Sequence, residues 1–438
     1  MSSYKLTPPQ FLVLSFASVI IIGSLALITP WAANCPTRYI DALFTSASAV
    51  CVTGLVVLDT GTHWTTFGQT IIMLLIQVGG LGVMAFATSF ALLLGRKIHL
   101  KERLIMQQAI NTSTVGGVVR IFRYLLGFTF LTETLGALIL AIRFTPMMGI
   151  KKALWFGLFH SISAFNNAGF DLFGDFKSIT GFTSDITINL VISSLIIIGG
   201  LGFYVSYELY HYRQTRSLSL HTKIVLITTT ALIIIGTILL LGSEYHHAFK
   251  NMPLGTKLLA AYFQSVSPRT AGFNSIDLNS LFVSSQLLIV ILMFIGASPG
   301  STGGGIKTST FTLLLAAMFS QLRGKKDTEI MERRIDTNDV LQALTLVMMA
   351  TFTVILVTFL IALDHQGDFM KILFEVTSAF GTVGLTLGLT TELNTIGKAL
   401  LIATMLLGRV GPLTLGFALA YKEKQPEIRY AKGKIMIG

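Results

Sequence analysis

The chain alternates long apolar stretches with short polar ones. Eight apolar stretches recur along its 438 residues, each long enough to cross a bilayer, for which a helix needs about 20 residues. Their bounds are 11–31, 66–94, 121–142, 186–210, 224–241, 284–321, 341–363 and 396–421. The pattern predicts an all-α polytopic membrane protein with eight transmembrane spans, the first of them retained rather than cleaved as a leader.

Composition and charge support this prediction. Charged residues make up 12% of the chain, about half the share in an average soluble domain. If the spans alternate, 20 of the 32 Lys and Arg residues fall on one side of the membrane. The positive-inside rule then places both termini in the cytoplasm. The net charge of +11 is explained by this topology and requires no nucleic-acid partner.

A short segment that ends in glycine lies between each odd-numbered span and the next. The four segments read FTSASAVCVTGL, FHSISAFNNAGF, FQSVSPRTAGF and FEVTSAFGTVGL. Each begins with phenylalanine (Phe44, Phe159, Phe263, Phe374), carries a serine (Ser48, Ser163, Ser267, Ser378) and reaches the glycine (Gly54, Gly169, Gly272, Gly384). A second glycine follows inside the next span (Gly79, Gly199, Gly296, Gly408).

Recurrence of the same order at a period of about 110 residues indicates an internal repeat. Each unit contains a span, a half-length segment and another span, an arrangement abbreviated M1-P-M2. The predicted units are residues 1–110, 111–217, 218–335 and 336–421, followed by a cytoplasmic tail, 422–438. A half-length helix cannot end in lipid with unpaired carbonyls. We therefore expect four re-entrant segments, entered from the outer face, around one central pore.

The glycines predict the chemistry of that pore. Glycine permits the unusual backbone that points successive carbonyls one way, and rings of carbonyls can replace the hydration shell of K⁺. No carboxylate lies in the four residues that end at each glycine, CVTG, NNAG, RTAG and GTVG, which favours a monovalent cation over a divalent one. Asp59, Asp171 and Asp277 follow the glycines, where they either attract cations or are ordinary loop carboxylates.

These motifs, with HSISAFNNAGF, RTAGFNS, STGGGIK and GRVGPLT, resemble the Ktr/Trk/HKT superfamily of potassium transporters, and within it the KtrB/KtrD-type membrane subunits. The resemblance implies K⁺ uptake across a bacterial cytoplasmic membrane, Na⁺ as a possible activator, a homodimer, and a cytoplasmic nucleotide-binding RCK ring of KtrA/KtrC type. Nucleotide is expected on that partner only. The implied selectivity filter is Val52, Thr53, Gly54, Asn167, Ala168, Gly169, Thr270, Ala271, Gly272, Thr382, Val383 and Gly384.

The run GASPGSTGGGIKT in the sixth stretch superficially resembles a phosphate-binding loop. A Walker A loop has glycine directly before the lysine, whereas Ile306 precedes Lys307 here. Proline and consecutive glycines instead break the helix. We predict an intramembrane gate, in a place where the other units keep an unbroken helix. Its residues are Gly296, Ala297, Ser298, Pro299, Gly300, Ser301, Thr302, Gly303, Gly304, Gly305, Lys307 and Arg409.

Charged residues inside apolar stretches are costly and functional by default. Lys307 either belongs to the gate or reaches toward the membrane surface from a helix end. Arg409 either contacts backbone carbonyls of neighbouring helices or, as the resemblance implies, faces the pore and contacts the gate, and it can do both. Glu375 is expected to support packing or the filter and to pair with Arg269. Glu133 has no assigned role.

Other functions are less consistent with the sequence. Two cysteines and eight scattered histidines predict no disulfide framework, transition-metal site or bound cofactor. The sequence also contains no Walker A loop and no paired intramembrane aspartates, so an enzyme is not expected. An ion-coupled secondary transporter with a substrate site at broken helices remains the alternative to a gated K⁺ pathway, although four units running the same way count against it.

Overall fold

The structure, a computed structural model, describes residues 7–82, 118–365, 367–412, 414 and 416. Helices dominate these residues, with one small antiparallel hairpin of β1 (Thr328–Ile330) and β2 (Arg333–Ile335). The predicted tail 422–438 and most of the loop after the second apolar stretch lie outside the described residues.

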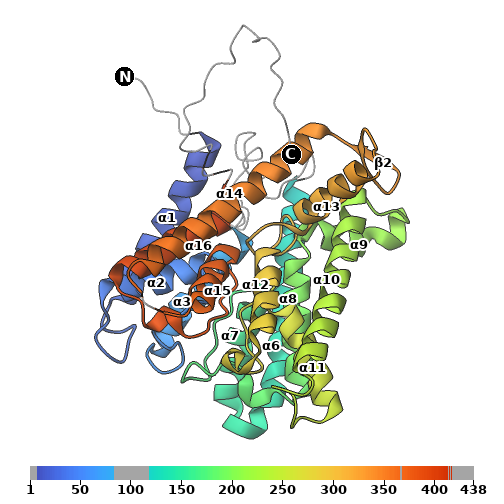
Figure 1. The fold of residues 1–438 in the computed structure, drawn as a ribbon. Coiled ribbons are helices and arrows are strands. Elements are labelled where there is room, and N and C mark those ends of the chain that lie inside the picture. The colour runs from blue at the N-terminus through green and yellow to red at the C-terminus, as the bar shows by residue number, and fades with distance from the viewer. Residues whose placement is uncertain (1–6, 83–117, 366, 413, 415, 417–438) are drawn as a thin grey trace.

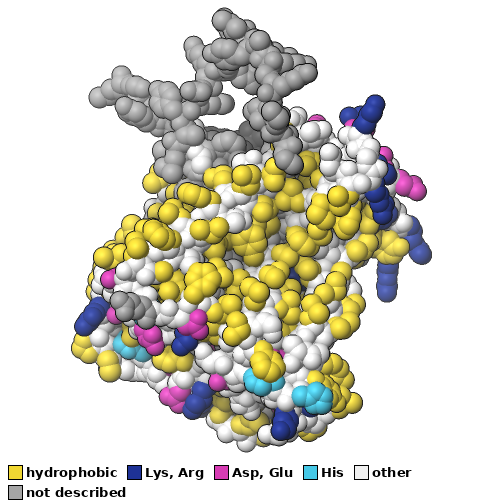
Figure 2. Space-filling view, viewed as in Figure 1, with side chains coloured by type: hydrophobic (Ala, Val, Ile, Leu, Met, Phe, Trp, Pro, Cys, Tyr) yellow, Lys and Arg dark blue, Asp and Glu magenta, His cyan; other side chains and the backbone are white. Residues whose placement is uncertain are grey.

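Four long apolar helices follow one another along the chain. They are α1 (Pro8–Leu27), α6 (Val118–Met148), α10 (Leu220–Glu244) and α14 (Thr337–Ala362). Each exposes large apolar side chains: Ile22 is 66% exposed, Ile142 73%, Ile238 62% and Phe352 66%. Apolar side chains cover the middle of the face in Figure 2, while charged and histidine side chains gather toward its edges. Such a surface suits lipid rather than water.

A short helix follows each long one. The short helices are α2 (Tyr39–Val50), α7 (Ile150–Phe165), α11 (Leu254–Val266) and α15 (Phe369–Gly381). The repeated phenylalanine of each unit is fully buried in its short helix. Each short helix packs on the long helix before it, so each unit begins with an αα-hairpin.

In the first three units a serine fastens the short helix to the long one. Ser46 Oγ donates to the carbonyl of Ile20 (2.7 Å), Ser161 Oγ to that of Glu133 (2.6 Å) and Ser265 Oγ to that of Ile233 (2.8 Å). A glycine of the long helix faces each serine so closely that a Cβ would lie 2.4–2.6 Å from its Oγ. These glycines are Gly23, Gly136 and Gly236. Close helix approach through small residues is typical of membrane helix packing.

The second helix of each unit is short. These helices are α3 (Thr66–Leu81), α8 (Ile186–Gly200), α12 (Val283–Phe294) and α16 (Thr395–Val410). In three of them a side chain caps the first turn: Thr65 accepts from the Gly68 N–H, Asp185 from Ile188 N–H and Asn394 from Gly397 N–H. The caps fix where each helix starts. The cause of their early ends lies in the glycines described next.

The prediction of unbroken second helices outside the third unit is wrong for the second unit. Residues 186–210 do not form one helix, because α8 and α9 (Phe203–Thr215) meet at an angle of 97°. The bend lies at Gly202, whose φ of 95° is not helical. Equivalent glycines with φ of 86° and 93° end α3 at Gly82 and α16 at Gly411. Within the described residues, four helices qualify as spans by length and composition, or five with this bent pair.

Among the described residues, the third unit has the longest interruption. Residues 295–307 separate α12 from α13 (Thr308–Leu322); we call them the 295–307 loop. The predicted break is therefore confirmed in position. Within the described residues it is longer than the bend between α8 and α9, so the third unit is not alone in being interrupted.

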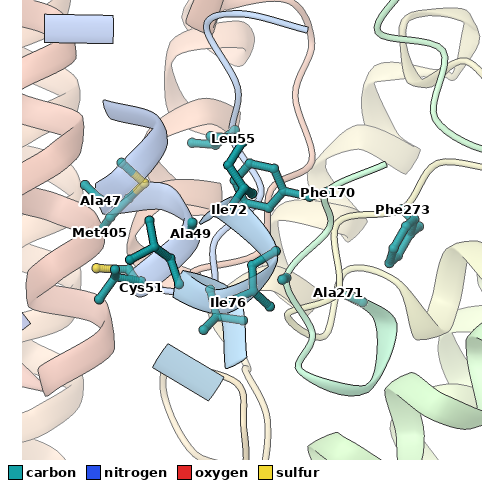
Figure 3. Close-up of a cluster of buried hydrophobic side chains, with 14 of the residues drawn as sticks. Ala47, Ala49, Cys51, Leu55, Ile72, Ile76, Phe170, Ala271, Phe273 and Met405 are labelled. Carbon is teal, nitrogen blue, oxygen red and sulfur yellow. The ribbon is translucent and has the colours of Figure 1, made fainter. Parts of the chain in front are cut away.

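The core joins all four units. Figure 1 shows α2 and α3 beside α15 and α16, so the first and last parts of the chain meet. In Figure 3 buried side chains from the four units gather in one cluster, among them Ile72 of α3, Phe170, Phe273 and Met405 of α16. The units therefore close into a ring around a shared interior.

Candidate ion pathway

Four segments near the centre of this ring share one unusual backbone conformation. We call them the glycine segments: residues 52–54, 167–169, 270–272 and 382–384. The first residue of each is left-handed without being glycine, with φ of 58° at Val52, 59° at Asn167, 81° at Thr270 and 50° at Thr382. The repeated glycine at the end of each is left-handed as well, with φ of 70–93°. Strained conformations persist where the surrounding structure over-determines them, often at functional sites.

The four glycines form a closed ring. A Cβ on Gly54 would lie 2.4 Å from the carbonyl oxygen of Ala168, and one on Gly169 would lie 2.9 Å from that of Ala271. Gly272 faces the carbonyl of Val383 at 2.3 Å in the same way, and Gly384 faces the carbonyl of Thr53 at 2.3 Å. Each unit thus packs a carbonyl against the glycine of its neighbour. All twelve predicted filter residues are brought together at this ring, and every one is fully buried.

The repeated serines hold the glycine segments in place. The Ser48 hydroxyl accepts from the Gly54 N–H (3.1 Å), and the Ser378 hydroxyl accepts from the Gly384 N–H (3.0 Å). Ser163 and Ser267 instead donate to the carbonyls of Phe170 (2.7 Å) and Phe273 (2.5 Å). Side chains after the glycines pack outward into the core, as Figure 3 shows for Leu55, Phe170 and Phe273. Backbone atoms are therefore left to form the ring.

A second set of buried polar side chains lies behind the ring. The residue after the repeated phenylalanine is polar in every unit: Thr45, His160, Gln264 and Glu375. His160 Nε2 accepts from the Leu172 N–H (3.3 Å). Glu375 accepts from Thr386 Oγ1 (2.9 Å) and from the Thr390 N–H (3.0 Å). Both brace the chain just after the glycine. Sequence reasoning singled out only Glu375, although the shared register after phenylalanine marked all four.

The predicted pair of Arg269 and Glu375 is wrong. Arg269 extends to α10, where it donates to Thr229 Oγ1 (3.3 Å) and lies 3.5 Å from the Thr229 carbonyl. Glu375 is occupied by the loop after Gly384, as described above. The two side chains brace separate units from behind.

Glu133 lies in a buried network between the first and second units. Its Oε1 accepts from Asn166 Nδ2 (3.0 Å) and its Oε2 from Gln77 Nε2 (3.2 Å). Asn166 Nδ2 also donates to Gln77 Oε1 (3.0 Å). Asn166 directly precedes the glycine segment 167–169. The carboxylate thus supports that segment through an amide, and no single-residue signal in the sequence indicated this.

The 295–307 loop crosses beneath the ring and is bonded to the second unit. The Ser298 N–H donates to the carbonyl of Gly200 (3.0 Å) and the Thr302 N–H to that of Gly199 (3.3 Å). Beyond the bend in that unit, the Phe203 N–H donates to the carbonyl of Gly300 (2.9 Å). The bend at Gly202 therefore provides the room and the donor that hold the loop.

The other side of the loop touches the third and fourth units. A Cβ on Gly303 would lie 2.1 Å from Thr270 Oγ1, and one on Gly304 would lie 2.4 Å from Thr382 Oγ1. The Gly304 N–H donates to Thr382 Oγ1 (3.1 Å). Only glycine fits this close to the ring. Of the predicted gate residues, Gly303 and Gly304 consequently lie directly against the glycine segments.

Two cations hold the loop. Lys307 Nζ donates back to the Gly303 carbonyl (2.6 Å), so its side chain belongs to the loop and does not extend toward the membrane surface. Arg409 donates to the carbonyl of Thr302 in the loop, and to those of Gly79 and Gly80 in the first unit. Arg409 therefore bridges the loop, the fourth unit and the first unit through backbone carbonyls.

Known proteins match this chain along nearly its whole length. Residues 7–429 match the TrkH family, described as "Cation transport protein". The chain belongs to the TrkH family. One relative, "Ktr system potassium uptake protein B" of Bacillus subtilis (strain 168), is 46% identical over 99% of this chain and 97% of its own length. "Potassium/sodium uptake protein NtpJ" of Enterococcus hirae is 39% identical over 99% of this chain and 98% of that protein.

A solved structure of the same family supports the fold. The crystal structure of the potassium transporter TrkH from Vibrio parahaemolyticus superposes with a TM-score of 0.75 at 20% identity, covering 96% of this chain and 86% of that one. The predictions of a mostly helical, multi-pass membrane protein and of a transporter rather than an enzyme are confirmed.

In this TrkH-family chain the three aspartates beyond the ring hold loops. Asp59 Oδ1 accepts from the Thr62 N–H (2.8 Å) and its Oδ2 from the Phe176 N–H (2.8 Å). Asp171 accepts from the Phe173 N–H (3.1 Å), and Asp277 from the Asn279 N–H (3.0 Å) at the 3-10 turn Leu278–Ser280. These bonds support the reading of ordinary loop carboxylates.

Proposed function

We propose that this chain is the pore-forming subunit of a Ktr-type system that takes up K⁺ across a bacterial cytoplasmic membrane. The observation that carries the proposal is the closed ring of four glycine segments. The identity of the cation as K⁺ is inferred from the relatives of Bacillus subtilis and Vibrio alginolyticus named "Ktr system potassium uptake protein B". The predicted M1-P-M2 units, 1–110, 111–217, 218–335 and 336–421, then form one pore of eight spans, four of which are the interrupted second helices.

The ring selects the ion through backbone oxygens. Carbonyls of four equivalent segments meet at one level, and such oxygens replace water around K⁺. The short helices end at these segments, so their negative ends are directed at the cation. Serine, histidine and glutamate behind the ring keep the carbonyls from collapsing onto a smaller ion. The filter comprises the twelve residues at 52–54, 167–169, 270–272 and 382–384.

The 295–307 loop is the gate. It lies against the filter, is bonded to the second and fourth units, and is held by Lys307 and Arg409. Its glycines permit a change of shape without side-chain repacking. The positive charge of Arg409 beneath the filter adds an electrostatic barrier to K⁺ while the loop is in place.

The same proposal includes the assembly. A homodimer carries one pore in each protomer, and a cytoplasmic RCK ring of KtrA/KtrC type binds nucleotide and moves the gate, while this chain binds none. Na⁺ acts as an activator. The name of the Enterococcus hirae relative, a potassium/sodium uptake protein, supports this role. Both termini face the cytoplasm, as the distribution of Lys and Arg indicates.

Substitution of a filter glycine tests the function. We expect Gly272→Ser and Gly54→Ser to reduce the preference for K⁺ over Na⁺ by about tenfold, because a side chain there meets a neighbouring carbonyl and perturbs the ring. The measurement is K⁺ and Na⁺ flux into liposomes driven by each ion's own gradient. Flux that requires both ions together would instead support the ion-coupled transporter.

Gly149→Ser is the matched control. Gly149 also has a positive φ, 76°, but a Cβ there meets nothing within 4 Å. It shares the backbone strain without the ring contact, so its selectivity should equal that of the wild type. Unchanged selectivity in both filter variants contradicts the filter assignment.

A cysteine label tests the orientation. Cys35 is exposed and Cys51 is buried; the proposed topology places Cys35 outside the cell. A membrane-impermeant maleimide added to intact cells should label the wild type and leave Cys35→Ser unlabelled. Labelling of Cys35 only after the cells are opened means that the topology is inverted.

A further inference from the structure

One hydrogen bond joins the gate directly to the filter. The Gly304 N–H in the 295–307 loop donates to Thr382 Oγ1 at 3.1 Å. Both residues are inside the protein, and Thr382 is fully buried. Thr382 is also the first residue of the filter segment of the fourth unit, two residues before Gly384.

Thr382 is a residue that needs external support. Its φ of 50° is left-handed, which is unfavourable for a β-branched side chain. Its own N–H is bonded to the Ala379 carbonyl (3.2 Å), and the next residue, Val383, donates to the Ser378 carbonyl (2.9 Å). The hydroxyl, in contrast, is bonded to the loop. Support for the side chain therefore comes from the gate and not from the filter itself.

The other units do not share this arrangement. In the third unit Thr270 Oγ1 lies 3.1 Å from the side-chain amide of Asn167, so its hydroxyl is bonded within the filter. In the first unit the equivalent residue is Val52, which has no hydroxyl. Among the first residues of the four filter segments, Thr382 is thus the one whose side chain accepts a hydrogen bond from the gate.

We propose that the Thr382 hydroxyl is a specificity-determining contact that transmits the state of the gate to the filter. With the loop in place, Gly304 holds Thr382 and, through the chain, the Val383 carbonyl that packs against Gly272. When the loop withdraws, Thr382 is released and this quarter of the ring fits K⁺ less closely. Gate opening therefore changes selectivity as well as flux. The inference rests on the proposed function.

Two substitutions at this position isolate the hydroxyl. Thr382→Val keeps the β-branched shape and removes the acceptor, whereas Thr382→Ser keeps the acceptor. We expect Thr382→Val to raise K⁺ flux and to lower the K⁺ to Na⁺ preference, each by about three- to tenfold, the range set by one hydrogen bond. Thr382→Ser should restore both toward wild type. Thermal stability measured alongside shows that each variant is folded.

Thr377→Val is the matched control. Thr377 lies in the same short helix and is 1% exposed, and its hydroxyl has no hydrogen-bond partner among the described residues. The same chemical change there should leave flux and selectivity at wild-type values. If Thr382→Val behaves like Thr377→Val, the contact does not transmit the gate.

A deletion distinguishes a gate effect from a filter effect. Removing residues 300–304 should raise flux and lower selectivity, and Thr382→Val added to this deletion should change neither further, because the shared contact is already lost. Additive effects would mean that Thr382 acts on the filter alone and would overturn the inference. Absence of selective K⁺ flux in the wild type rejects the proposed function itself, a result that these variants cannot produce.

Discussion

The ring of glycine segments and the layer directly beneath it are built in opposite ways. In the ring, four units repeat one backbone conformation, one serine and one glycine contact. Beneath it, the four second helices differ: α8 bends into α9, α12 is separated from α13 by the 295–307 loop, α3 and α16 end at Gly82 and Gly411, and α16 alone carries an arginine. The same repeat thus produces four similar segments in the ring and four different helices in the layer beneath it.

This difference follows from two tasks. In the proposed pore, an ion without its water requires oxygens from several sides, and the four equivalent glycine segments provide them. A single loop that blocks a pore cannot be four-fold, because copies would collide at the axis. One unit provides the loop, and the others provide the groups that bind it.

The largest expected effect concerns a feature that the units share, the close approach of the second helix to the short helix. A Cβ on Gly199 would lie 1.9 Å from the carbonyl of Phe165, and one on Gly408 would lie 1.8 Å from that of Phe380. A backbone carbonyl cannot move aside as a flexible side chain can. Gly199→Ala and Gly408→Ala should therefore each lower the free energy of unfolding by at least about 3 kcal/mol and abolish the monodisperse peak in size-exclusion chromatography.

Gly242→Ala is the control for this pair. Gly242 lies in α10, and a Cβ there meets nothing within 4 Å; alanine should be neutral or slightly stabilising in a helix. If Gly199→Ala elutes like Gly242→Ala, the close approach of second and short helices is not a requirement of the repeat.

An intermediate effect concerns a feature that differs between the units, the arginine that only α16 carries among the second helices. Arg409→Gln removes a charged donor to Thr302, Gly79 and Gly80, and charged hydrogen bonds contribute about 1.5–3 kcal/mol. We expect K⁺ flux into liposomes to rise about tenfold as the loop loses its anchor. Arg143→Gln, at an ion pair with Asp185 at the start of α8, should leave the flux unchanged. A flux equal to that of wild type in Arg409→Gln would show that this arginine does not hold the gate.

The smallest effect concerns closure of the ring. Lys398 Nζ lies 2.7 Å from Asp41 Oδ1, joining the fourth unit to the first, with side chains 15% and 11% exposed. Lys398→Met should lower the free energy of unfolding by about 1 kcal/mol, as expected of a partly exposed pair, and leave selectivity intact. A thermal shift assay measures it, and a loss of K⁺ preference would mean that the pair shapes the filter.

The sequence predicted the features that the four units share better than the features in which they differ. Phe, Ser and Gly recur in order because each has the same backbone task in four places, so the positions of the glycine segments and of the break in the third unit could be found by comparing the units with one another. The bend at Gly202 was missed because the apolar stretch continues to residue 210, although the GGLG motif that precedes it also ends α3 at Gly82. Its angle depends on bonds to the 295–307 loop, which is distant in the sequence.

Pairings between units were also beyond the sequence. Arg269 and Glu375 have opposite charges at neighbouring repeat positions, but burial directs each toward its nearest backbone or hydroxyl partner. Glu133 was singled out as costly without an assignment, because its partners Gln77 and Asn166 come from two other elements. Such networks are set by packing, and no period in the sequence encodes them.

The contact between Gly384 and the Thr53 carbonyl has a consequence for biosynthesis. These residues are the last and first members of the ring, so a ribosome must complete nearly the whole chain before the ring can close. Contacts of such long sequence separation form late. A nascent chain that ends before Gly384 therefore lacks the contact that closes the ring between the fourth unit and the first.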